Sequence, residues 1–182
     1  MASPSSPSSS SEPPLIVTLR LDEHSTAIFN ELRRRHFPPH LNRVGAHLTL
    51  FHQLPARWLP NVLADLRELA PPPFDVVVTQ PVLLGRGVAI EAQSAKLEAI
   101  RNQLALRWSK WLTPQDRQPF RPHITVQNKV DPAVARQLHA TLAQTQYWPT
   151  VLATGWSVWR YLGGPWLSEA EIPFRRSTSA EE

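Results

Sequence analysis

The spacing of apolar residues along the chain predicts alternating strands and helices in two similar halves. In the first half, a strand over 15–21 precedes a helix that Asp22 can cap, and a second strand is predicted over 47–54. A helix over about 58–69 and a strand over 74–84 complete this half. Prolines separate several of these segments, as expected where helices and strands end.

The second half repeats the same order of strand, helix, strand, helix and strand. The predicted segments are 88–90, 94–108, 123–130, 131–142 and 150–161. Asp131 and Pro132 mark the start of the last helix, because Asp caps helices and Pro suits their first turn. A final strand over 166–174 is expected to pair back as a hairpin after a Gly-Gly-Pro turn. The order of elements therefore predicts an internal repeat of two like lobes.

Each half contains one copy of a four-residue pattern, His-apolar-Thr-apolar. The copies are His47-Leu48-Thr49-Leu50 and His123-Ile124-Thr125-Val126. Successive side chains of a strand point to opposite faces, so each His shares a face with its Thr while the apolar residues face a core. Two lobes related by a pseudo-two-fold axis would bring both pairs into one cleft. Two imidazoles with two hydroxyls beside them suit acid–base chemistry on a phosphate.

The neighbours of the motifs are weaker candidates for the site. If each strand continues without a bulge, Phe51 and Gln127 occupy the next outward positions, where each could contact a substrate or simply pack. Arg121 could bind phosphate through its guanidinium, or it could be an ordinary surface arginine. His52 falls on the face opposite His47 and is therefore discounted.

Two further polar runs have simpler explanations than a functional one. The arginines at 33–35 resemble a nucleic-acid-binding patch, but basic residues also favour the last turn of a helix, where they complement its dipole. His36 and His40 have a spacing that suits metal ligands on a helix. The prolines at 38 and 39 prevent a helix between them, so a zinc site is rejected.

Composition limits the class of protein. The chain has 182 residues with 42% hydrophobic content, which suits a single domain over 13–174 flanked by a Ser/Pro-rich tail over 1–12 and a polar tail over 175–182. Cysteine is absent, so disulfides and thiolate nucleophiles are excluded. No signal peptide or membrane span of ~18 apolar residues is present, which predicts a soluble, cytoplasmic protein. The net charge of +4 is compatible with an anionic substrate, and nothing demands more than a monomer.

The two motifs resemble the hallmark of the two-histidine phosphoesterase superfamily, in the branch of 2′-5′ RNA ligase-like and RNA 2′,3′-cyclic phosphodiesterase proteins. That hallmark is a pair of His-x-Thr/Ser-x motifs, one on each lobe, and both copies are intact here. Arg121 and Pro122 are similar to the basic residue and proline that often precede the second motif. The turn at 162–166 is similar to the closing turn of some bacterial members. The resemblance spans roughly residues 14–174.

The resemblance implies an α+β fold of two lobes, each an antiparallel sheet with helices on its outer face, and an active cleft between them. It implies His47 as the acid and His123 as the base of phosphodiester hydrolysis, with Thr49, Thr125 and Arg121 on the phosphate. The implied reaction opens an RNA 2′,3′-cyclic phosphate to a 2′-phosphate, with 2′-5′ RNA ligation as the reverse activity. No cofactor, metal or membrane partner is expected. A small substrate (a cyclic nucleotide or ADP-ribose cyclic phosphate) and a non-catalytic RNA-binding module remain as alternatives.

Overall fold

The structure is a computed structural model that describes residues 12–175. Apart from two short 3-10 turns, its elements in chain order are β1 (Leu15–Leu21), α1 (Glu23–His36), β2 (Leu48–Leu54), α2 (Leu59–Glu68), β3 (Phe74–Leu83), β4 (Val88–Gln93), α3 (Ala95–Arg107), β5 (His123–Gln127), α4 (Pro132–Leu142), β6 (Val151–Tyr161) and β7 (Trp166–Pro173). The expected tails lie almost entirely outside the described residues.

The predicted order of strands and helices is confirmed. The expected cap of α4 is present, since the Asp131 side chain accepts a hydrogen bond from the backbone N–H of Ala133 at 2.7 Å. Two strands differ from their predicted bounds by three residues: β4 continues to Gln93 instead of ending at residue 90, and β5 ends at Gln127 instead of continuing to residue 130. Lys129 has a φ of 58°, and this left-handed conformation is incompatible with an extended strand.

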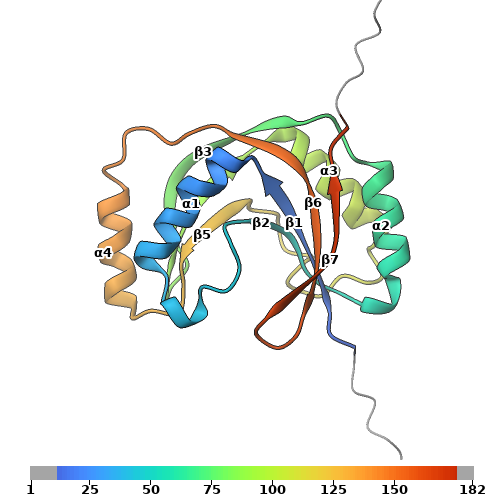
Figure 1. Ribbon diagram of the computed structural model, residues 1–182, viewed down its shortest axis with the longest axis horizontal. Coiled ribbons are helices and arrows are strands. Elements are labelled where there is room, and N and C mark those ends of the chain that lie inside the picture. Colours follow the sequence, from blue (N-terminus) through green and yellow to red (C-terminus); the bar gives the residue numbers. More distant parts are fainter. Residues whose placement is uncertain (1–11, 176–182) are drawn as a thin grey trace, which may run out of the picture.

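All strand pairs are antiparallel and form one sheet in the order β1-β2-β5-β4-β3-β6-β7. β1 also pairs with β6, so the sheet closes on itself and β7 lies outside the ring, on β6. Two seams of this ring are narrow. β2 meets β5 at Leu48 and Ile124, and β3 meets β6 only through residues 74–76 and 151–153. These seams divide the sheet into two lobes, β1-β2-β6-β7 and β3-β4-β5 (Figure 1).

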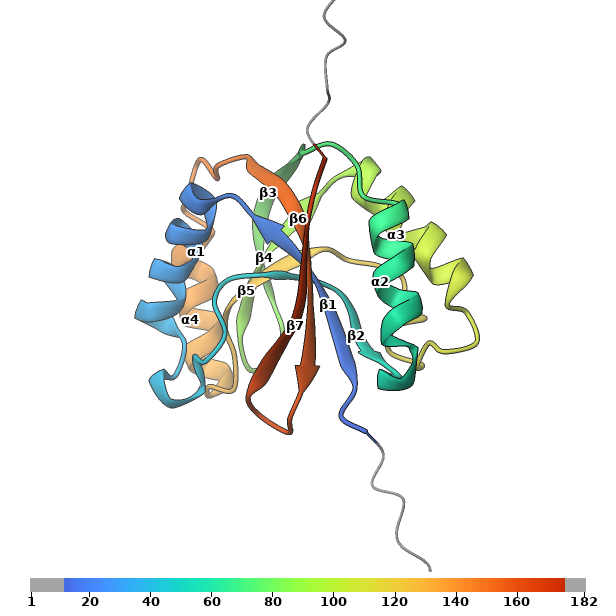
Figure 2. The ribbon, with the colours of Figure 1, turned by 45° about the vertical axis from the view of Figure 1, so that its right-hand side comes forward.

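The two halves of the chain exchange elements between these lobes. Apart from the added strand β7, each lobe combines two strands of one half with the third strand of the other, since β6 lies with β1 and β2 while β3 lies with β4 and β5. The helices are exchanged as well, because each lobe is flanked by one helix from each half: α1 and α4 flank the β3-β4-β5 lobe, and α2 and α3 flank the other (Figures 1 and 2). This exchange is consistent with a duplicated unit and ties the two lobes into one domain.

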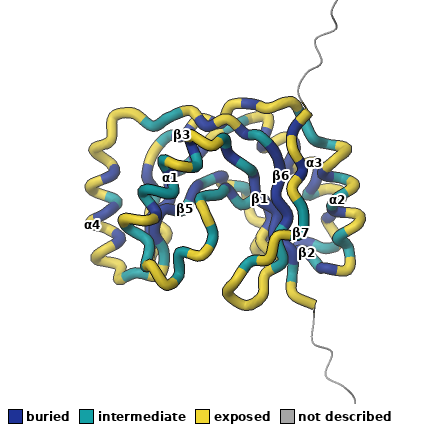
Figure 3. Tube along the Cα trace, viewed as in Figure 1, coloured by how far each residue is buried: buried dark blue, intermediate teal, exposed yellow. Residues whose placement is uncertain are grey.

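The interior is formed by the sheet and the inward faces of the helices, and the outer helical faces are exposed (Figure 3). The apolar residues of both motifs belong to this core. Leu48, Ile124 and Val126 are fully buried, and Leu50 is 1% exposed. Burial of each such side chain stabilises the fold by about 1.5–3 kcal/mol, which anchors both motif strands. None of the helices between residues 12 and 175 has the length and apolar content needed to span a lipid bilayer.

Candidate active site

The narrow seam between β2 and β5 sets the two motifs side by side. Leu48 pairs with Ile124 in antiparallel register, which places His47 across from Thr125 and Thr49 across from His123. Side chains directly opposite each other have Cβ atoms about 5 Å apart, and diagonal neighbours lie about 7–8 Å apart. The two histidines therefore occupy diagonal corners of a motif square (His47, Thr49, His123 and Thr125).

Equivalent hydrogen bonds hold the two histidine rings. The Nδ1 of His47 donates to the carbonyl of Gly45 at 2.7 Å, and the Nδ1 of His123 donates to the carbonyl of Arg121 at 2.7 Å. In both cases the partner lies two residues upstream. Because a carbonyl oxygen only accepts, each ring carries its proton on Nδ1 when neutral and leaves Nε2 available for proton transfer.

The two histidines differ in their surroundings. Trp166, the first residue of β7, packs against the His47 ring with the ring centroids 4.9 Å apart. Burial lowers the pKa of His47 to about 4, and the charges of Arg33, His123 and His52 act in the same direction. His47 is therefore neutral at pH 7 in the free protein.

The predicted phosphate-binding residues lie next to the motif histidines. Thr49, Arg121 and His123 line a hollow of about 180 Å³ together with His52. Thr125 faces His47 across the seam through the register described above. A phosphate held within the motif square would meet two hydroxyl donors and, at one side, an exposed guanidinium.

Phe51 does not face the cleft, so its expected contact with substrate is wrong. The pairing of β1 with β2 steps from Thr18–Thr49 to Val17–Phe51, which leaves Leu50 as an extra residue on β2. Such a bulge reverses the alternation of faces in the rest of the strand. Phe51 is consequently fully buried, with its ring centroid 4.9 Å from that of Trp108 on the core side.

The second motif strand contains the same irregularity. The pairing of β4 with β5 steps from Ala89–Thr125 to Val88–Gln127, which leaves Val126 as the extra residue. Gln127 is turned into the interior and is only 3% exposed, so its expected substrate contact is also wrong. Both motifs thus end on a bulge at their fourth residue, which limits the cleft-facing part of each strand to its His and Thr.

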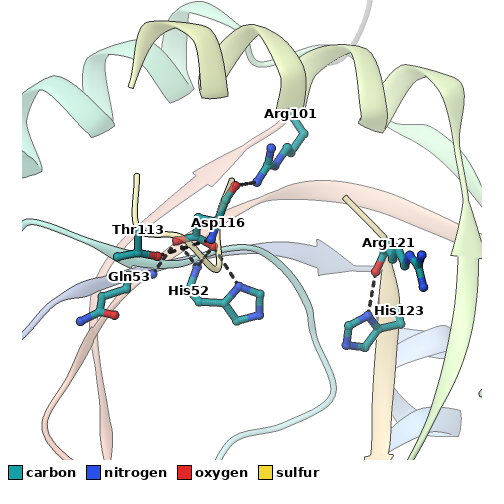
Figure 4. Close-up of polar contacts among 7 residues, drawn as sticks. All are labelled: His52, Gln53, Arg101, Thr113, Asp116, Arg121 and His123. Carbon is teal, nitrogen blue, oxygen red and sulfur yellow. Dashed lines mark hydrogen bonds and ion pairs between the residues drawn. The ribbon is translucent and has the colours of Figure 1, made fainter. Parts of the chain in front are cut away.

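The bulge in β2 brings to the cleft a residue that the sequence interpretation had discounted. His52 follows Phe51 and lines the hollow with Thr49 and His123. Figure 4 shows its side chain beside Asp116. Its Nδ1 lies 3.0 Å from Oδ1 of Asp116, a carboxylate only 1% exposed. Burial alone would raise the pKa of Asp116, but the hydrogen bonds it accepts from His52 and Gln53 lower it overall. The cleft therefore contains an aspartate-oriented third histidine.

Arg33 links the two motifs from α1. Its guanidinium donates to the carbonyl of Thr125 at 2.7 Å, to that of Val44 at 2.9 Å and to Oδ1 of Asn42 at 3.1 Å. Burial lowers the pKa of Arg33 to about 10, so the group stays charged at neutral pH. The interpretation of the basic run as a solvated last helical turn fits Arg34 and Arg35, which are exposed and pair with Glu31, but not Arg33.

No group of three or more His, Asp or Glu side chains suited to a metal ion occurs between residues 12 and 175. The chemistry that the described cleft offers is proton transfer by imidazoles and hydrogen bonding from hydroxyl and guanidinium groups. These groups suit an anionic phosphoester.

Comparisons with known proteins identify a family and a fold. A family model described as the 2′-5′ RNA ligase superfamily matches residues 21–165, which include both motifs. No curated protein matches the chain.

Solved structures with a similar fold include TT0787 of Thermus thermophilus, at 21% identity with a TM-score of 0.56, covering 90% of this chain and 99% of that one. E. coli LigT complexed with 3′-AMP is similar at 17% identity with a TM-score of 0.60, covering 91% of this chain and 99% of that one. At such identities these structures show the fold alone. The family model spans most of the sequence, both motif strands and the helices between them, and the chain therefore belongs to the 2′-5′ RNA ligase superfamily.

Proposed function

We propose that the protein opens an RNA 2′,3′-cyclic phosphate to a 2′-phosphate by metal-independent hydrolysis, with His47 and His123 as the catalytic residues. Ring opening needs a base to deprotonate water and an acid to protonate the departing 3′ oxygen, on opposite sides of the phosphorus. The observation that carries the proposal is the matched pair of Nδ1 hydrogen bonds, which leaves both Nε2 atoms available at diagonal corners of the motif square.

The superfamily and the chemistry of the cleft both support a ribose phosphate as substrate. The superfamily is named for 2′-5′ RNA ligation. E. coli LigT has been solved with 3′-AMP, a ribonucleotide whose phosphate is on the 3′ oxygen of the ribose. With a 5′-hydroxyl in place of water, the same attack on a cyclic phosphate would form a 2′-5′ phosphodiester. Water at about 55 M competes with scarce RNA ends, so hydrolysis is the expected main direction.

The direct test is turnover of a short RNA that ends in a 2′,3′-cyclic phosphate, measured in EDTA. We expect the ring to open and the product to carry a 2′-phosphate, which phosphorus NMR distinguishes from the 3′ isomer. Turnover of only a cyclic nucleotide or ADP-ribose cyclic phosphate would move the substrate class to small molecules. RNA binding without turnover of any of these would assign a binding role instead.

The surroundings of the two histidines support a division of roles opposite to the one that the family resemblance implies. A group with a pKa of about 4 is protonated about once in a thousand molecules at pH 7, so His47 is poorly prepared to act as an acid. We propose that Nε2 of His47 takes the proton from water, that the water oxygen bonds to phosphorus, and that Nε2–H of His123 protonates the 3′ oxygen as its bond to phosphorus breaks.

This assignment predicts which variant a better leaving group rescues. Sulfur in place of the departing 3′ oxygen leaves as a thiolate and needs no proton from an acid. With this substrate, His123→Ala is expected to recover most of the activity that it loses on the oxygen substrate, whereas His47→Ala stays impaired. Rate measurements on both substrates check this, and rescue of His47→Ala instead would restore the assignment that the resemblance implies.

The motif threonines are expected to stabilise charge on the non-bridging phosphate oxygens. Thr49→Val and Thr125→Val keep the shape of each side chain but remove the donor, and each is expected to lower kcat by about 10–10³-fold. Steady-state kinetics measure the effect. Thr141→Val, on the exposed face of α4, is the matched control and should leave kcat unchanged. Wild-type rates in both motif variants would remove the threonines from the phosphate site.

A further inference from the structure

We propose that His52 and Arg121 form a subsite for the phosphodiester that joins the terminal nucleotide to the rest of an RNA chain. This inference rests on the proposed function and specifies a feature of its substrate, a second phosphate beside the cyclic one. A nucleoside 2′,3′-cyclic phosphate lacks that second phosphate, so the subsite would favour RNA ends over free cyclic nucleosides.

The first support is the way His52 is held. Both oxygens of the Asp116 carboxylate are occupied: Oδ1 accepts from the backbone N–H of His52 at 2.9 Å and from its ring at 3.0 Å, and Oδ2 accepts from the N–H of Gln53 at 3.0 Å. The carboxylate is 1% exposed, but the His52 side chain is 43% exposed. Such a pairing fixes the ring tautomer and orientation, and it leaves Nε2 directed to solvent. An oriented ring of this kind loses little side-chain entropy when it binds a ligand.

The second support is the position of His52 relative to the motif square. His52 comes three residues after Thr49 along β2, a separation of about 10 Å at most. Thr49, His52, Arg121 and His123 line the same hollow. The subsite is therefore next to the reacting phosphate, at its His123 end.

The third support is charge. When His52 is protonated, one ring N–H donates to Asp116 and the other remains for an acceptor. Arg121 is exposed and takes part in none of the ion pairs found between residues 12 and 175. The protonated His52 ring and the Arg121 guanidinium would place two donors on one hollow, which matches the two non-bridging oxygens of a phosphodiester.

The test compares three substrates: adenosine 2′,3′-cyclic phosphate, the same compound with a 5′-phosphate, and the dinucleotide ApA with a terminal cyclic phosphate. We expect the wild type to favour the second and third by about 10–100-fold in kcat/KM, the value of one charge-assisted hydrogen bond. His52→Asn should remove most of this preference, because it lowers kcat/KM on the second and third substrates far more than on the first. His24→Asn, an exposed residue of α1, is the matched control and should change nothing.

Other outcomes would overturn the inference. An equal loss on all three substrates would give His52 a structural or catalytic role, and a preference confined to the dinucleotide would place the nucleoside rather than the phosphate at His52. Asp116→Asn, with its folding checked by thermal unfolding, should reduce the same preference by loosening the ring.

Binding separates this inference from the proposed function. Calorimetry with adenosine 2′-phosphate and its 5′-phosphorylated form needs no turnover. If no cyclic substrate is turned over but the 5′-phosphate still improves binding through His52, the proposed function fails and the subsite stands. If turnover occurs without any effect of His52 on the preference, the subsite fails and the proposed function stands.

Discussion

Replacing either motif histidine with alanine is expected to lower kcat for opening an RNA cyclic phosphate by about 10²–10⁴-fold. Each replacement removes one of the two proton-transfer groups, and water cannot take its place at a fixed distance from the phosphorus. His47→Ala and His123→Ala should fall within the same range because the ring opening needs both the base and the acid. The double variant should be little slower than the worse single variant, because groups that act as a unit are not additive.

The control for this experiment is a histidine outside the cleft. His139 lies on α4, where its Nε2 contacts the carbonyl of Pro81 at 3.1 Å. His139→Ala should therefore keep wild-type kcat, and thermal unfolding should show that all variants are folded. Near-wild-type turnover in either motif variant would contradict the two-histidine mechanism and assign the proton transfer to another group.

The elements that the sequence predicted well are those set by local chemistry. Strand β1 occupies the residues predicted for it, because a mainly apolar run with Ile16, Val17 and Thr18 at its centre lies between prolines and a capping aspartate. Asp22 and Asp131 could be recognised as caps because the hydrogen bond that a cap forms reaches only two or three residues along the chain.

The two bulges lay beyond this kind of prediction. A single extra residue at Leu50 or Val126 exchanges the two faces of a strand without any change in composition. The sequence of the second copy contains one signal, the glycine at position 87 beside the start of β4. A Cβ on Gly87 would lie 2.1 Å from the carbonyl oxygen of Gln127, so the strands approach closely where β5 bulges. No equivalent glycine marks the first copy, and His52 was consequently assigned to the wrong face.

The partners of His52 and Arg33 are separated from them in sequence, so no local pattern could reveal them. Asp116 comes from the loop before β5, 64 residues after His52. Arg33 had a weaker signal, because it follows the fully buried Phe29 by one helical turn and therefore shares its inward face. The helical period separates Arg33 from its exposed neighbours, although the three arginines look alike in sequence.

Replacing Arg33 with alanine is expected to lower the free energy of unfolding by about 3–5 kcal/mol. The guanidinium is the donor to three acceptors in the segments that carry the motifs, Thr125 O, Val44 O and Asn42 Oδ1. A buried acceptor left without a donor costs about 1–3 kcal/mol. The substitution also removes the packing of the guanidinium over the Phe37 ring, where Cζ of Arg33 lies 4.3 Å from the ring centroid.

Arg34→Ala provides a close control, since it removes the same side chain from the next residue of the same helix. Arg34 is exposed and paired with Glu31, and loss of such a surface pair costs less than about 1 kcal/mol. Urea unfolding of both variants measures the difference. A difference below about 1 kcal/mol would show that the Arg33 hydrogen bonds are replaced by water and add little to stability.

The same residue is expected to affect catalysis in the molecules that remain folded. Thr125 is a corner of the motif square, and Val44 lies in the loop that leads to His47. Because the Arg33 guanidinium donates to the backbone carbonyls of both residues from α1, it fixes the distance between the two motifs. A displacement of about 1 Å between acid and base can cost about 10²-fold in rate. Arg33→Lys retains the charge and can donate to only part of the acceptor set, so its kcat and stability should both lie between those of wild type and Arg33→Ala. If stability falls in this order while kcat stays constant, Arg33 supports the fold without setting the geometry of the two histidines.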